Sequence, residues 1–141
     1  MELRLPFPPA PEFMADHASH LVRAAETIEG ERLDYEIASL GTVDRILGRF
    51  HDDHQDSRLI AETLFLFGAY IGEVIVRQAD GSWIAPASHE PMGGGWPVVR
   101  LDRGGIVNPI GKAFKRVEHG PGDSITYFYD ALVRSPDGSA R

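Results

Sequence analysis

The residues best suited to chemistry are the four consecutive side chains His51, Asp52, Asp53 and His54. Imidazole and carboxylate groups bind divalent metal ions, and a metal held by them would support a metal-dependent hydrolase. The run belongs to seven polar residues, 51–57, between two apolar segments, which is also typical of an exposed turn between helices. The sequence favours the exposed turn and leaves a metal site made of His51, Asp52 and His54 as the alternative.

Glu73 is the second candidate, because it lies on the most hydrophobic stretch of the chain, residues 61–77. A carboxylate in such a place must be hydrogen-bonded or ion-paired, or its pKa rises. Arg77 is four residues further on and in reach on the same helix. Cations later in the chain are further candidates for the pair: Arg100, Lys112 and Arg116. A structural ion pair is the simpler interpretation. The alternative is a general acid or base, which would need a second catalytic group beside it.

A local basic patch is predicted on residues 109–119, where Ile110, Ala113 and Val117 form the apolar stripe of a helix. Helical periodicity places the basic residues on the opposite face; they are Lys112, Lys115, Arg116 and His119. That face is either the solvated side of an amphipathic helix or a dock for an acidic partner or a small anionic ligand. Asn108 precedes this helix.

Two tryptophans, Trp83 and Trp96, flank a loop rich in Gly and Pro at residues 86–95. Tryptophan is enriched among the residues that dominate binding energy at interfaces. Exposed tryptophans would therefore make this loop an interaction surface, whereas buried ones would belong to the core.

The composition excludes several classes of function. The 141 residues include no Cys, which removes disulfides, thiolate metal sites and a cysteine nucleophile. The net charge of −7 argues against a nucleic-acid partner, since binding a polyanion needs a basic footprint. The longest apolar run, residues 64–70, is far shorter than the ~18 residues of a membrane span, and the start of the chain lacks the features of a signal peptide. We therefore expect a cytoplasmic protein with no membrane or nucleic-acid partner and no cofactor.

The candidate residues are positioned by a predicted order of three helices, three strands and two helices. Helices are expected over residues 11–28, 37–50, 61–77 and 109–119, with a last one capped by Asp123, and strands over 82–85, 96–101 and 106–108. Residues 61–77 are apolar on nearly every side, so this helix is expected to be central and buried. Gly68 and Gly72, four residues apart on it, predict a groove where another element packs closely.

Helices and strands are segregated along the chain, which indicates an α+β fold. We expect three N-terminal helices, the third of them the buried central helix, then a small antiparallel three-stranded meander and two C-terminal helices. Residues 1–141 are interpreted as a single domain, with an extended lead-in at 1–10 and a disordered tail at 135–141.

Several segments between residues 33 and 133 resemble a group of small bacterial domains of unknown function. The most specific are Gly-Ala-Tyr-Ile-Gly-Glu at 68–73 and Asn-Pro-x-x-Lys at 108–112. The resemblance implies that the central helix, Trp83, Asn108, Pro109 and Lys112 belong to a shared design. It implies no activity.

No motif of a known catalytic or nucleotide-binding site is present in the sequence. We therefore expect a small binding protein without catalytic activity. Its partner would be a protein or a small anionic ligand, bound at the tryptophan-flanked loop and the basic face. An enzyme that uses His51–His54 as a metal site, or Glu73 as a general base, is the alternative. Symmetric dimers are the commonest soluble oligomers, so a homodimer is a further expectation.

Overall fold

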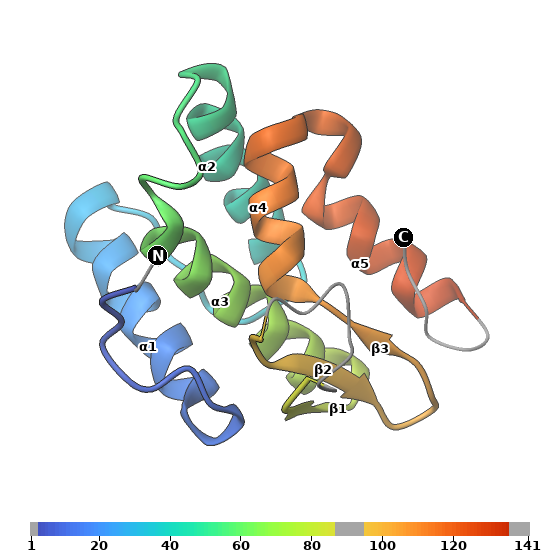
Figure 1. Ribbon diagram of the computed structural model, residues 1–141. Helices are drawn as coiled ribbons and strands as arrows, with labels where there is room; N and C mark the ends of the chain where they lie inside the picture. The colour runs from blue at the N-terminus through green and yellow to red at the C-terminus, as the bar shows by residue number, and fades with distance from the viewer. Residues whose placement is uncertain (1–2, 87–94, 136–141) are drawn as a thin grey trace.

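The computed structural model describes residues 3–86 and 95–135 and has the α+β fold that the sequence predicts (Figure 1). Within this part of the chain, five α-helices accompany one three-stranded antiparallel sheet. The helices are α1 Met14–Ala24, α2 Ser39–Asp52, α3 Ala61–Ala79, α4 Pro109–His119 and α5 Ile125–Arg134; the strands are β1 Gly81–Ile84, β2 Val98–Leu101 and β3 Ile106–Val107.

The central helix α3 lies between α1 on one side and α4 and α5 on the other (Figure 1). Its two interior glycines are required by close packing. A Cβ on Gly68 would lie 2.4 Å from the Cα of Ile110 in α4, and a Cβ on Gly72 would lie 2.1 Å from the Trp83 ring. Both distances are far inside van der Waals contact, so the predicted glycine groove is confirmed, and it is filled by two different neighbours.

The sheet follows the strand order β1-β2-β3, with Trp83 paired to Val99 and Val99 paired to Val107. The face that carries Val99 and Val107 is buried, and the neighbouring row of Arg100 and Ile106 is exposed. Strands β2 and β3 are shorter than predicted, and β1 keeps its predicted length but begins one residue earlier. Trp96 and Pro97 precede the first pairing of β2, since proline has no N–H to donate, and β3 ends before Asn108, which caps α4 instead.

Helix ends account for most differences from the predicted elements. The first helix ends in a π-helical turn, Ala25–Glu29, and Ile28, the last residue of the predicted helix, is exposed. Ile37 precedes α2 and is also exposed. The side chain that caps α5 is Ser124, which accepts a hydrogen bond from the N–H of Tyr127; Asp123, the predicted cap, pairs with a lysine instead.

Two predicted irregular segments lie mostly outside the described residues: the loop at 86–95, except for its two ends, and the tail at 135–141, except for Ser135. Within residues 3–86 and 95–135, no helix has both the length and the apolar character needed to cross a membrane.

Candidate functional site

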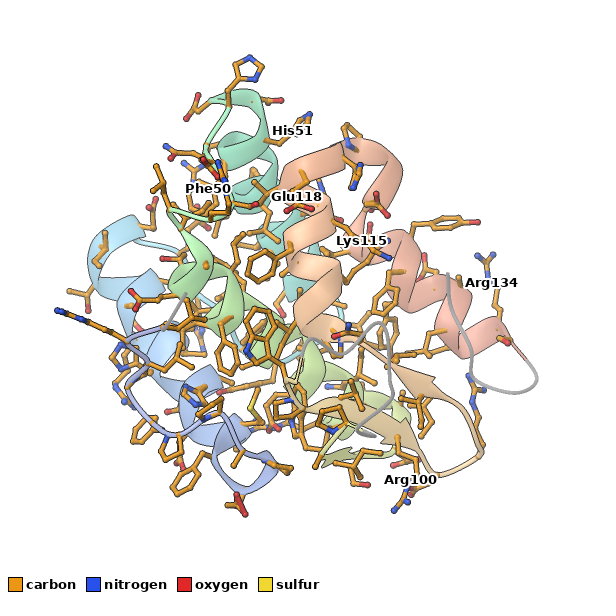
Figure 2. The ribbon with its side chains drawn as sticks, in the orientation of Figure 1. Phe50, His51, Arg100, Lys115, Glu118 and Arg134 are labelled. Atoms are coloured by element: carbon orange, nitrogen blue, oxygen red, sulfur yellow. The ribbon has the colours of Figure 1, made fainter. Side chains whose placement is uncertain are left out.

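The His51–His54 run is not the fully exposed turn that the sequence predicts. His51 and Asp52 are the last residues of α2, and His54 has a left-handed backbone conformation, φ 57°. The half-buried His51 ring faces the end of α4 (Figure 2), where its Nδ1 lies 2.6 Å from the carbonyl oxygen of Val117. Among the described residues, no group of three or more His, Cys, Asp or Glu side chains is arranged to hold a metal ion.

Glu73 is buried, and both of its carboxylate oxygens have partners. The indole N–H of Trp83 donates to Oε2 at 2.8 Å, and Nε of Arg77 donates to Oε1 at 3.3 Å. The Arg77 guanidinium also lies 3.6 Å from the centre of the Tyr35 ring. No second acid, His or nucleophile of the described chain hydrogen-bonds to Glu73. The Glu73–Arg77 ion pair lies within α3, and the hydrogen bond from Trp83 is what joins α3 to β1.

The predicted basic patch on α4 is wrong for two of its four residues: Lys112 and Arg116 are buried, whereas Lys115 and His119 are exposed. Lys112 is only 7% exposed and donates to Asp123 at 2.9 Å, and Arg116 is 8% exposed and donates from Nε to Asp44 at 3.1 Å. Gly120, with φ 87°, reverses the chain after α4, so the next segment and α5 fold back over this face. The exposed cations Lys115 and Arg100 lie on separate parts of the molecule (Figure 2).

Asp44 on α2 is a hydrogen-bonding residue of the interior that the sequence analysis missed. Its carboxylate accepts from the backbone N–H groups of Ile125 and Thr126, from the Ser124 hydroxyl, and from Arg116. Burial alone would raise the pKa of Asp44, but the hydrogen bonds that it accepts lower that pKa below its ordinary value. Asp44 therefore joins α2, α4 and the first turn of α5. The only sign of this role in the sequence was that Asp44 is an acid next to the apolar positions of α2.

The two tryptophans are half-buried packing residues. Trp83 covers Gly72 and binds Glu73, and the Trp96 ring lies between Phe65 and Phe114, with centroid distances of 5.7 and 5.4 Å. Asn108 caps α4, since its side-chain oxygen accepts from the N–H of Gly111 at 3.0 Å. These predicted binding residues contribute to the packing around α3 and α4.

His17 is a buried titratable group to which the sequence assigned no role. Its Nε2 lies 3.0 Å from the carbonyl oxygen of Pro8 in the lead-in segment, and its ring meets Phe7 and Phe65 edge to face. Its Nδ1 is buried without a hydrogen-bond partner in the described structure. Burial lowers the pKa of His17 below its ordinary value of 6.5, because a proton on Nδ1 would be both desolvated and unpaired.

The lowered pKa of His17 predicts a specific loss of stability in mild acid. As the pH falls below 6.5, the unfolded chain takes up a proton that the folded state resists, so the free energy of unfolding decreases, by at most about 1.4 kcal/mol per pH unit for one proton. Urea denaturation at pH 7.5 and at lower pH would show this slope in the wild type. The slope is expected to be smaller in His17→Gln and unchanged in His20→Gln, which alters an exposed His on the same helix.

A cavity of about 240 Å³ lies between the start of α2 and α5. The walls on the α2 side include Ile37, Leu40 and Gly41, and those on α5 include Thr126, Tyr129 and Asp130. Ile37 in the wall is 45% exposed, and Tyr127, which follows the wall residue Thr126 in α5, is 61% exposed. Asp130 is exposed, so the cavity opens to solvent.

Comparison with known proteins gives a family without a known activity. The model of a family of unknown function, DUF6278, matches residues 10–131. No curated protein and no solved structure matches the chain. Because the match covers most of the chain, the protein is a member of the DUF6278 family of unknown function.

Proposed function

We propose that this protein is a non-catalytic binding protein that docks a protein partner on the surface formed by α2 and α5. The observation that carries this proposal is the solvent-open cavity between the two helices, with the exposed side chain of Ile37 in its wall. Small-molecule sites occupy roughly 300–1,000 Å³. A cavity of about 240 Å³ suits one anchoring side chain of a protein better than a whole metabolite.

The ionic interactions of the interior support a binding role. Glu73 pairs with Arg77, Lys112 with Asp123, and Arg116 with Asp44. The first pair lies within α3, and the other two connect α4 to the segment before α5 and to α2. The buried charged groups of the described chain therefore stabilise the fold, and a partner would be recognised by surface residues.

The proposed surface differs from the one that the sequence favoured. Lys112 and Arg116 are withdrawn into ion pairs, so α4 does not offer a basic dock. Cytoplasmic residence, a bacterial source and a homodimeric state are part of the proposal and rest on the sequence alone. If the protein forms a homodimer, a second copy is itself a candidate partner for the α2–α5 surface.

Gly41 allows a direct test, because a Cβ added there meets no other atom within 4 Å. Gly41 lines the cavity, so Gly41→Leu places a bulky side chain at its wall, and the added Cβ itself causes no clash. Affinity capture from cells that produce the protein would compare the wild type with this variant, and with Ala15→Leu on the exposed side of α1 as the matched control. A partner captured by the wild type and the control, but lost with Gly41→Leu, is expected. Equal capture by all three proteins would contradict the proposal.

A further inference from the structure

We infer that the α2–α5 cavity receives an arginine or lysine side chain of the partner, with its cationic group on the Asp130 carboxylate. This inference rests on the proposed function and adds the chemistry of the anchoring residue. The cavity combines apolar walls from Ile37, Leu40 and Tyr129 with one carboxylate at the solvent side. An apolar stem that ends in a cation matches that combination.

The Asp130 carboxylate is free to accept such a cation. It makes no ion pair or hydrogen bond with any described residue. Arg134, one turn further on in α5, donates from Nε to the backbone carbonyl of Asp130 at 3.1 Å rather than to its carboxylate. This exposed carboxylate beside an apolar cavity is therefore available to pair with a cationic group of another molecule.

The surroundings of the cavity disfavour an anion. Two exposed acids lie shortly before Ile37 in the chain, Glu36 directly and Asp34 three residues earlier, and the whole protein carries a net charge of −7. Like-signed charge repels an acidic group and attracts a basic one.

The N–H groups near the cavity are also occupied. At the start of α2, the N–H groups of Leu40 and Gly41 donate to the carbonyls of Ile37 and Ala38. At the start of α5, the N–H of Thr126 donates to Asp44. Neither helix start therefore offers these donors to a carboxylate or phosphate, which argues against the small anionic ligand at this place.

The test is an NMR titration of the ¹⁵N-labelled full chain with two short peptides, acetyl-Ala-Arg-Ala-amide and acetyl-Ala-Glu-Ala-amide. The arginine peptide is expected to shift the amide signals of Gly41, Thr126 and Asp130 in a saturable way, and the glutamate peptide is not. Asp130→Asn should weaken binding of the arginine peptide about 3- to 10-fold, which corresponds to one lost charge pair. Asp53→Asn, an exposed acid at the far end of α2, should leave it unchanged.

Three outcomes would overturn the inference: no saturable shift at the cavity, equal binding of both peptides, or an Asp130→Asn variant with unchanged affinity. These results are separable from a failure of the proposed function. If Gly41→Leu abolishes partner capture but the arginine peptide does not bind, the surface is an interface of another chemistry. If the peptide binds at the cavity but Gly41→Leu leaves capture intact, the partner docks elsewhere.

Discussion

Gly68→Ala is expected to lower the free energy of unfolding by about 3 kcal/mol or more. The added methyl would lie 2.4 Å from the Cα of Ile110, which is a backbone atom and cannot turn away as a side chain can. Relief of the contact requires α3 and α4 to separate, and this would loosen the packing around the buried residues Ile71 and Ala113. Urea denaturation followed by far-UV circular dichroism would measure the loss.

The matched control is the same substitution at Gly41, a helical glycine whose added Cβ meets nothing. Gly41→Ala should raise stability, by up to about 1 kcal/mol, because alanine is the better helix former. Opposite signs for the two substitutions would show that Gly68 is kept for the approach of α4. Similar effects at both positions would contradict the close packing of α3 on α4.

Asp44→Asn is expected to cost about 3 kcal/mol. The substitution leaves the buried Arg116 guanidinium without its counter-charge and places an amide where two backbone N–H groups now donate to carboxylate oxygens. Because Asp44 joins α2, α4 and α5, the substitution weakens the contacts among all three helices. Urea denaturation at pH 7 would measure the loss, with Asp53→Asn, an exposed acid just after the end of α2, as the near-neutral control.

A double variant separates the ion pair from the cap. Asp44→Asn combined with Arg116→Met removes the stranded charge, so it should be less destabilised than the sum of the two single variants. The pH dependence gives a second check. Because the folded pKa of Asp44 lies below its ordinary value of 3.8, its contribution is present above that pH and is lost as the pH falls through the folded pKa. Additive single effects would show that Asp44 and Arg116 are not coupled.

The elements that follow from local pattern were predictable from the sequence. The unbroken apolar character of α3 predicted a buried central helix, and the pair Gly68 and Gly72 predicted close neighbours on it. Asn108 and Pro109 at the start of α4 likewise agree with ordinary helix-start chemistry, since proline is tolerated in the first turn. Each of these inferences uses residues within a few positions of one another.

The polar interior was not predictable, because it depends on contacts between distant parts of the chain. Lys112 and Arg116 look solvated on an isolated amphipathic helix, and they are buried only because α5 folds back and Asp44 meets Arg116 across 72 residues. His17 is likewise covered by Pro8 and Phe65, which no periodicity connects to it. The α2–α5 cavity is formed by two helices that are far apart in the sequence. No local sequence pattern could therefore predict it.

The most direct test of the α2–α5 surface as a docking site is photo-crosslinking in the cells that produce the protein. A photoreactive phenylalanine derivative would replace Tyr127, 61% exposed and next in α5 to the cavity residue Thr126, or Leu59, 84% exposed beyond the opposite end of α2. An adduct with one defined protein, or with a second copy of the chain, is expected from position 127 and not from position 59. No adduct at 127, or equal adducts at both positions, would contradict the α2–α5 docking site.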